Sequence, residues 1–143
     1  MRLNWRLFWI ALLALSAFSL DAVIPASAQT YLFNRAVLQV QSLPEAVAAA
    51  DLNSDGAVDL LAANSGSNTV SVFKNQGNGR FSASPVVQTG RGPAALAVAD
   101  FNGDGKPDLA VANAADNTVS VFVGNGDTTF TVISTANVGL HPV

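Results

Sequence analysis

The chain has no cysteine, and it has one histidine among its 143 residues. Without cysteine it can form neither disulfides nor thiolate metal ligands. The histidine, His141, is third from the end, so the pairing of a nucleophile with an imidazole base has almost no residues to use. These absences argue against nucleophilic catalysis, and they leave core packing or an oxygen-bound metal to hold the fold.

Long apolar runs are also scarce, and the one at residues 7–20 lies in a segment with the layout of a secretory signal peptide. Two arginines precede this run, and the sequence Pro-Ala-Ser-Ala closes the segment. The layout predicts a signal peptide over residues 1–28, with cleavage before Gln29. A membrane anchor is the alternative, but fourteen helical residues rise only about 21 Å against a hydrocarbon core of about 30 Å. We therefore expect a secreted, periplasmic or cell-surface protein with no membrane span in the mature chain.

Basic and aromatic residues are few after this segment. Cleavage removes both tryptophans, two arginines and one aspartate, which leaves five basic and nine acidic residues and a formal charge of −4. Binding to nucleic acid requires a basic surface, so no nucleic-acid partner is expected. A mature chain with one tyrosine and no tryptophan also offers few aromatic platforms for a sugar.

The chain does contain an internal repeat. Residues 44–81 align without a gap on residues 93–130 at a constant offset of 49, and 20 of the 38 aligned positions are identical. At the same offset Gly139 and Pro142 correspond to Gly90 and Pro93, so a third repeat opens before the chain stops. Upstream, residues 33–44 weakly resemble residues 81–93 once one gap is allowed.

This periodicity predicts how the chain is organised. After the signal peptide, residues 29–143 form the repeat region. It consists of a partial unit over residues 31–43, one repeat over 44–92, a second over 93–141, and a third that is cut short. We expect the intact protein to continue with repeats at the same spacing.

Each repeat has the pattern of four short β strands. The first strands are expected at residues 46–52 and 95–101, the second at 59–64 and 108–113, and the third at 69–73 and 118–122. Residues 86–89 and 135–138 are weaker candidates for a fourth strand. Stretches rich in Asn and Gly separate the strands and favour tight turns. Four short strands in a repeat of about fifty residues match one blade of a β-propeller.

The small and the aromatic side chains fit different places in such a blade. The first strand is rich in alanine, which suits the crowded position nearest the propeller axis. Four phenylalanines recur at a fixed register, and this recurrence favours packing between repeats over a ligand platform. They are Phe73, Phe81, Phe122 and Phe130.

Two acidic loops follow the first strands, and both fit the pattern D-x-N-x-D-G-x-x-D. Calcium takes six to eight oxygen ligands, and oxygens at alternate positions of a curled loop can converge on one ion. Positions 1, 3, 5 and 9 would ligate through side chains, and position 7 through its carbonyl oxygen. The predicted ligands are Asp51, Asn53, Asp55, Ala57 and Asp59 in the first loop, and Asp100, Asn102, Asp104, Lys106 and Asp108 in the second.

The loops share their first half with an EF-hand, but an EF-hand needs a glutamate at position 12 on an exiting helix. Here position 12 is Ala62 or Val111, and strand-like residues follow the last aspartate. The same strands argue against a dockerin. A turn without metal would account for Asp-Gly in each loop, but not for three carboxylates and an amide within nine residues, where like charges would repel.

These features resemble the FG-GAP or VCBS repeats of integrin-α-like β-propellers over nearly all of the mature chain. The resemblance implies an all-β, partial β-propeller with a Ca²⁺ loop between the first two strands of each blade. It also implies a ring of about seven blades on an extracellular or periplasmic protein that serves in adhesion or as a scaffold. Two blades cannot close such a ring, and an open ring exposes sheet edges.

The function predicted from the sequence is a non-catalytic, calcium-binding module for adhesion, with an extracellular protein or glycan as its partner. The alternative is the propeller part of a larger extracellular enzyme or lectin. Three acidic residues lie outside the two loops, Glu45, Asp116 and Asp127. A carboxylate pair for glycoside hydrolysis drawn from them is conceivable but has no further support.

Overall fold

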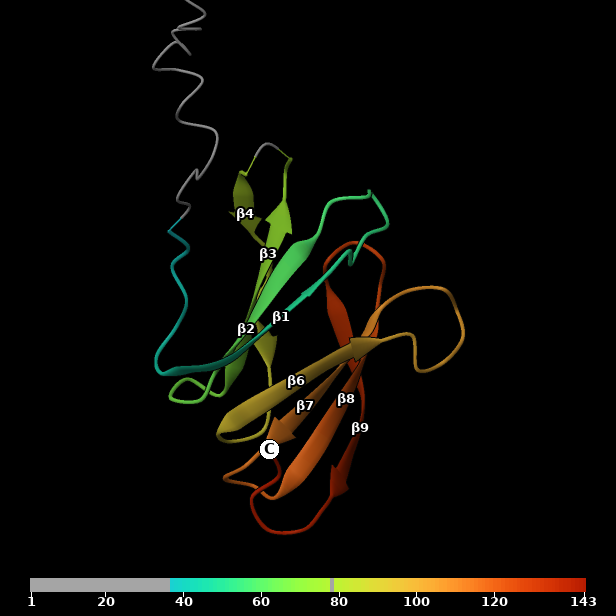
Figure 1. Cartoon of the computed structure of the whole chain (residues 1–143). Coiled ribbons are helices and arrows are strands. Elements are labelled where there is room, and N and C mark those ends of the chain that lie inside the picture. The colour runs from blue at the N-terminus through green and yellow to red at the C-terminus, as the bar shows by residue number, and fades with distance from the viewer. Residues whose placement is uncertain (1–36, 78) are drawn as a thin grey trace, which may run out of the picture. The chain divides into compact units, whose positions relative to one another are not determined.

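A computed structural model describes residues 37–77 and 79–143, which belong to one compact unit, Ala36–Val143. The predicted signal peptide and residues 31–36 of the partial unit lie outside the described residues. All regular secondary structure in the described part is β, arranged as two antiparallel sheets (Figure 1). Among the same residues, no helix is long and apolar enough to cross a membrane.

The first sheet is built from the first repeat. Its strands are β1 (Pro44–Ala50), β2 (Asp59–Asn64), β3 (Thr69–Asn75), β4 (Phe81–Ala83) and β5 (Val87–Gln88). They lie in the order β1-β2-β3-β4, and β5 also pairs with β3. β5 lies within the expected fourth strand, residues 86–89, whereas β4 was not predicted. The fourth strand of this sheet is thus in two pieces, which pair with opposite ends of β3.

The second sheet repeats this arrangement with a continuous fourth strand. It consists of β6 (Pro93–Ala99), β7 (Asp108–Asn113), β8 (Thr118–Gly124) and β9 (Phe130–Asn137), in that order. The second strands of both repeats have the bounds predicted from the sequence. The fourth strand begins at Phe130, five residues before its predicted start, because β9 pairs along the whole of β8.

The first strand of each repeat lies two residues earlier than predicted. β1 ends at Ala50 and β6 at Ala99, so Leu52 and Phe101 belong to the loops. The reason is a hydrogen bond in each loop: the N–H of Leu52 donates to Asp59, and that of Phe101 to Asp108. These N–H groups are therefore not used in strand pairing.

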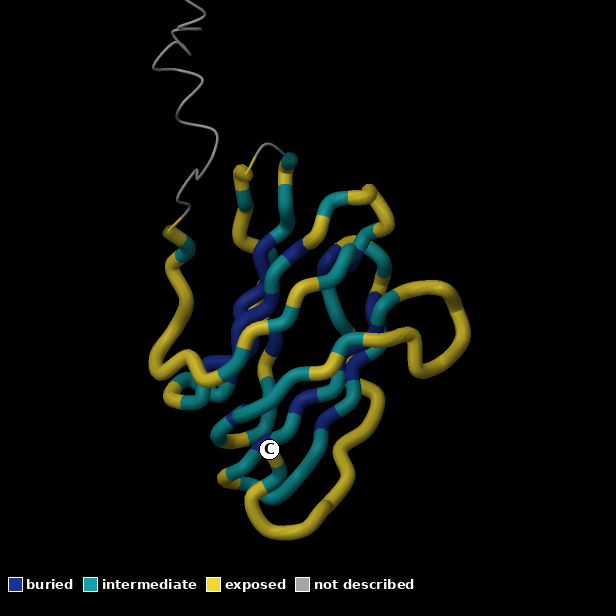
Figure 2. Tube along the Cα trace, in the orientation of Figure 1, coloured by how far each residue is buried: buried dark blue, intermediate teal, exposed yellow. Residues whose placement is uncertain are grey.

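The core lies between the two sheets. In the register of the first sheet, Leu61 lies opposite Ala48 and Val72, and this face packs on the face of the second sheet that carries Leu109 and Phe122. Figure 2 shows the buried positions on the central strands and the exposed ones in the loops. Phe73 and Phe122 are buried, as predicted, whereas Phe81 and Phe130 are half-buried.

The alanine-rich first strands of the two repeats lie next to each other. β1 contacts β6, and in Figure 1 both run in the same direction. Ala48 and Ala50 pack against the core cluster, together with Leu96 and Val98 of β6. Small side chains allow this close approach, which agrees with the innermost position that their composition predicted.

The residue before the first strand of each repeat has an equivalent conformation 49 positions later. Leu43 and Gly92 accept hydrogen bonds from Ser65 and Ala114 through their backbone carbonyls. Leu43, Gly92 and His141 all have a positive φ, of 51°, 63° and 55°. His141 N–H donates to the side chain of Asn117 as Gly92 N–H donates to that of Asn68. The backbone thus repeats into the third unit.

A glycine at the end of β8 holds the second repeat's acidic loop close to the sheet. A Cβ on Gly124 would lie 2.0 Å from the carbonyl oxygen of Pro107, which is a backbone atom that cannot move aside cheaply. Gly124→Ala is therefore expected to lower the free energy of unfolding by about 1–3 kcal/mol. Urea unfolding would measure this, with Gly139→Ala as the control because nothing lies within 4 Å of its Cβ position. Equal midpoints for the two variants would contradict the expectation.

Candidate functional site

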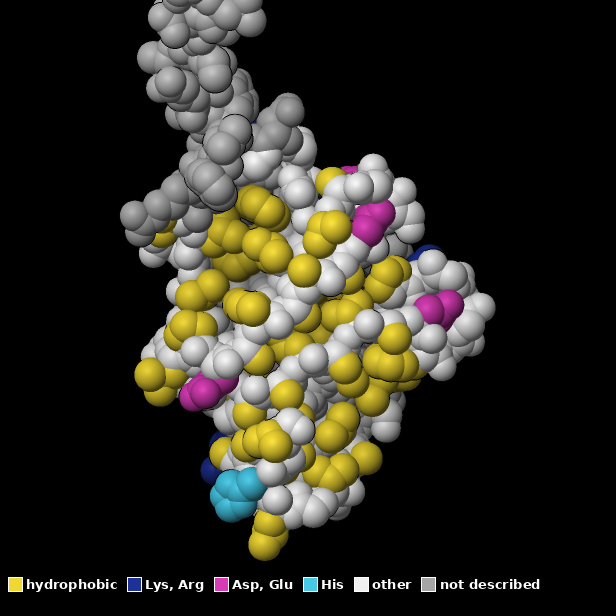
Figure 3. Space-filling view, viewed as in Figure 1, with side chains coloured by type: hydrophobic (Ala, Val, Ile, Leu, Met, Phe, Trp, Pro, Cys, Tyr) yellow, Lys and Arg dark blue, Asp and Glu magenta, His cyan; other side chains and the backbone are white. Residues whose placement is uncertain are grey.

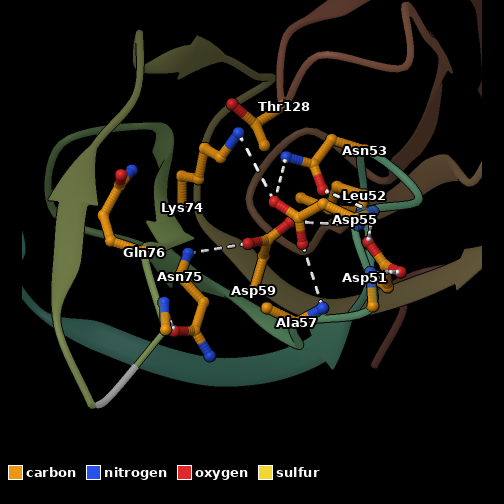
Figure 4. A network of polar contacts seen from close by, with 12 residues as sticks. Asp51, Leu52, Asn53, Asp55, Ala57, Asp59, Lys74, Asn75, Gln76 and Thr128 are labelled. Atoms are coloured by element: carbon orange, nitrogen blue, oxygen red, sulfur yellow. Dashed lines mark hydrogen bonds and ion pairs between the residues drawn. The ribbon is translucent and has the colours of Figure 1, made fainter.

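The first acidic loop joins β1 to β2 and is folded by hydrogen bonds to its own carboxylates (Figure 4). Asp51 accepts from the N–H groups of Asp55 (3.2 Å) and Gly56 (2.8 Å). Asp55 accepts from the N–H of Ala57 (2.9 Å) and from the Asn53 amide (3.0 Å). Gly56 has φ of 84°, a left-handed conformation that favours glycine and that lets the chain curl around these oxygens.

The second acidic loop, between β6 and β7, repeats most of these hydrogen bonds at the equivalent positions. Asp100 accepts from the N–H groups of Asp104 (3.2 Å) and Gly105 (2.8 Å), and Asp104 accepts from that of Lys106 (2.9 Å). Gly105 has φ of 83°. Its acidic side chains Asp100 and Asp104 are exposed, and Figure 3 shows acidic groups on loops at one side of the molecule. Both loops therefore present carboxylates to solvent from one common backbone conformation.

The last aspartate of each loop differs from the others because it is buried. Asp59 is 0% exposed, and it accepts from the N–H groups of Leu52 (3.0 Å) and Asn75 (2.7 Å). Asp108 is 1% exposed, and it accepts from the N–H groups of Phe101 (3.0 Å) and Gly124 (2.9 Å). Each buried carboxylate thus joins the start of its loop to the end of the third strand.

The two loops differ in the basic side chains around them. In the first, Lys74 Nζ on β3 lies 3.5 Å from Asp55 Oδ2. The residue 49 positions later is Val123, so the second loop has no such lysine on β8. Lys106 instead extends past Gly126 in the β8–β9 turn. In this turn the Thr129 hydroxyl is the main cause of a lowered pKa at Asp127, followed by the Thr129 N–H, and the charge of Lys106 contributes least.

The hydrogen bonds keep two of the loop carboxyls ionised. The N–H of Ala57, and then the Asn53 amide, lower the pKa of Asp55, and Lys74 contributes less. The N–H of Gly105 is the main cause of a lowered pKa at Asp100. Both carboxyls are exposed, so these shifts describe charge at neutral pH rather than a contribution to stability. Each loop is accordingly a concentration of negative charge.

The donor set of each loop suits a hard cation. It consists of carboxylate, amide and carbonyl oxygens, the ligand type that calcium prefers, and no nitrogen or sulfur ligand is among them. Within residues 37–77 and 79–143, however, no three acidic or histidine side chains converge closely enough to form a metal cluster as they stand. Coordination would therefore require the exposed side chains to turn toward a common point.

Each of the three acidic residues outside the loops has a hydrogen-bond partner that is not a second carboxyl. Glu45 accepts from the Ser65 hydroxyl, Asp116 binds Arg91, and Asp127 accepts from Thr129. Only the bond of Asp127 lies within a single turn.

The sequence interpretation missed two polar features. The first is the backbone N–H of Asn75 or Gly124 that anchors the buried aspartate. The second is a side-chain network in which the Asn64 amide donates to Thr69 and Ser71. Its counterpart in the second sheet runs from Asn113 to Thr118 and Ser120. The identical Asn, Thr and Ser at an offset of 49 were the available signal for this network.

Two antiparallel sheets that pack face to face, with alanine-rich first strands side by side, define two consecutive blades of a partial β-propeller. The chain belongs to the FG-GAP-like repeat family, which matches residues 51–111 and 100–142. These matches include both acidic loops, and they confirm the family resemblance inferred from the repeats.

A comparison with solved structures agrees with this fold. A chain in the crystal structure of BBS1N in complex with ARL6DN, soaked with lead, superposes with a TM-score of 0.51 and 14% sequence identity. The alignment covers 73% of the present chain and 29% of that chain, so the present chain spans under a third of the length of this structural neighbour. No curated protein matches the chain.

Proposed function

We propose that the protein is an exported, calcium-binding propeller module that binds an extracellular protein or glycan and is not an enzyme. The observation that carries the calcium proposal is the identical folding of two acidic loops whose intervening residues differ. Within the nine positions of the loops, the shared residues are the side-chain ligands at positions 1, 3, 5 and 9 and the glycine at position 6. Selection for a good turn alone would not require aspartate or asparagine at positions 1, 3, 5 and 9 in both.

The proposed ligands divide into groups on the loop surface and one buried carboxylate. Asp51, Asn53 and Asp55 would bind through side chains on the loop surface, and Ala57 would add its carbonyl oxygen. Asp59 is fixed by its two hydrogen bonds, but a carboxylate has further lone pairs for an ion. In the second loop the same roles fall to Asp100, Asn102, Asp104, Lys106 and Asp108. Calcium would supply positive charge, +4 for two ions against −4 for the mature chain.

Calcium is expected to stabilise the fold because the unfolded chain has no assembled site. With dissociation constants of about 10⁻⁴–10⁻³ M, as in extracellular modules, 10 mM calcium would add roughly 1–3 kcal/mol per site to the free energy of unfolding. Asp55→Ala and Asp104→Ala should each reduce this increase by about half. Thermal unfolding of the mature protein in chelator and in calcium measures it.

Lys106→Ala is the matched control, because only the main-chain carbonyl of this residue is proposed to bind. It should leave the increase intact. The ligand assignment is wrong if Lys106→Ala reduces the calcium effect as much as Asp104→Ala does, and the calcium proposal fails if the wild-type protein melts identically in both buffers. Magnesium at equal concentration separates specific coordination from charge screening.

The non-catalytic part of the proposal rests on the separate engagement of Glu45, Asp116 and Asp127. An interaction role suits two exposed loops on one side of stacked blades, where repeated surfaces can contact a partner. Export is proposed from the layout of residues 1–28.

A further inference from the structure

The two repeats differ at one position in a way that leaves a threonine hydroxyl of the second without its protein acceptor. In the first sheet the Asn64–Thr69–Ser71 network is completed by Gln41, whose Oε1 accepts from the Thr69 hydroxyl at 3.0 Å. Gln41 lies in the segment that leads into β1. At the offset of 49 the corresponding residue is Gly90, which has no side chain.

The hydrogen bonds around these two positions are similar. Ser42 and Arg91, the residues after Gln41 and Gly90, accept through their carbonyls from Gly66 and Ala115. The Asn113 amide donates to Thr118 (3.0 Å) and Ser120 (2.9 Å), as Asn64 does to its two hydroxyls. Only the partner of the Thr118 hydroxyl is missing among the described residues.

An open cavity of about 420 Å³ lies beside Gly90 and Thr118. Its lining includes Gly90, Thr118, Ser120, Thr135 and Phe122. A volume of this size is within the range of small-molecule sites. The chain cannot fill it from Gly90 without a shift, because a Cβ there would lie 2.7 Å from Cγ and Nδ2 of the Asn113 side chain.

The polar groups of the cavity define the chemistry of a ligand. Thr118 accepts from Asn113, so its own hydroxyl hydrogen is free to donate to an acceptor oxygen. Asp116, also in the lining, binds Arg91 through both carboxylate oxygens, at 2.6 Å from Nε and 2.7 Å from the backbone N–H. Its charge is therefore paired, while its remaining lone pairs can accept from an N–H group. A ligand that complements these groups has an acceptor oxygen for Thr118 and an N–H donor for Asp116, and a carboxamide has both.

We propose that the open cavity beside Gly90 and Thr118 binds a neutral carboxamide, whose oxygen accepts from the Thr118 hydroxyl as Gln41 accepts from the Thr69 hydroxyl in the first repeat. The carboxamide comes either from a small free amide or from a glutamine side chain of a peptide partner. This proposal does not rest on the calcium loops, because none of the cavity residues named here belongs to them.

NMR titration of the mature protein with propionamide tests the proposal, since this probe reproduces the glutamine side chain. Saturable shifts are expected at the backbone amides of Gly90, Thr118 and Ser120. A blocked tripeptide, acetyl-Gly-Gln-Gly-amide, distinguishes the two sources: tighter binding than propionamide assigns a peptide partner, and equal or weaker binding assigns a free amide. Glucose, which has hydroxyls and no amide, should cause no saturable shift.

Thr118→Val removes the donor hydroxyl at nearly constant volume and should weaken propionamide binding by up to about tenfold, the value of one hydrogen bond. Thr118→Ser keeps the hydroxyl and should bind like the wild type. Thr69→Val is the matched control, because it loses the equivalent hydroxyl in the repeat where Gln41 is the acceptor, and it should not change the affinity.

Several results would overturn the assignment. They are the absence of saturable shifts, shifts that map to Thr69 instead of Thr118, glucose binding as well as propionamide, or equal affinity in Thr118→Val and Thr118→Ser. If Thr118→Val does not fold, the positions of the shifted amides in the wild-type protein still show whether the ligand binds beside Thr118.

Discussion

Asp108→Ala is expected to lower the free energy of unfolding by roughly 2–6 kcal/mol, even in chelator. The substitution leaves the N–H groups of Phe101 and Gly124 without their shared acceptor. These groups lie in the interior, because the Asp108 side chain that they bind is 1% exposed. A buried donor without a partner costs about 1–3 kcal/mol. Because small domains are stable by only about 5–15 kcal/mol, this loss would leave a marginal fold. Asp59→Ala should behave in the same way.

Urea unfolding in chelator measures this loss without any contribution from metal. Asp104→Ala is the control, since its carboxylate is exposed and lies in the same loop. Asp108→Asn should fall between the two, because its amide keeps one acceptor oxygen for two donors. If Asp108→Ala and Asp104→Ala unfold at the same urea concentration in chelator, the buried carboxylate is not the anchor of the loop.

Leu61→Ala is the substitution with the second large expected effect. Leu61 is 0% exposed and belongs to the core cluster that joins the two sheets. Removing a buried leucine side chain costs about 2–5 kcal/mol, from lost burial and the cavity that remains. Since the cluster contains residues of both sheets, the loss should reduce the stability of both repeats together.

Circular dichroism and amide hydrogen exchange would measure this effect. Val47→Ala is the control, because Val47 is 79% exposed on the neighbouring strand, and its change should stay within about 0.5 kcal/mol. Exchange should accelerate in β7 and β8 as well as in β2. Faster exchange confined to the first sheet would show that the two repeats unfold independently.

Much of the fold could be predicted because its signals are local. The second strands, Asp59–Asn64 and Asp108–Asn113, have the predicted bounds, since aspartate ends each loop and a run of strand formers follows. The division of the fourth strand into β4 and β5 could not be predicted, because only pairing with β3 decides where its hydrogen bonds form.

For the candidate site, spacing identified both loops, and glycine at position 6 was correctly expected to curl them. Spacing could not show that position 9 is buried while position 5 faces solvent in both loops. That difference depends on the N–H groups of Asn75 and Gly124, which lie 16 residues further along the chain. Metal binding by these loops stays a prediction.

The sequence by itself determined the period of 49, the strand and loop alternation, and the positions of the acidic loops, because each is a pattern among residues close in the chain. The tertiary structure decided which face of each sheet packs against the other sheet. β2 is apolar on both faces, so Leu60 and Leu61 look equivalent until the second sheet packs on the side of Leu61. It also decided that Gln41 accepts from the Thr69 hydroxyl, since the two residues are 28 positions apart and meet only when the chain folds.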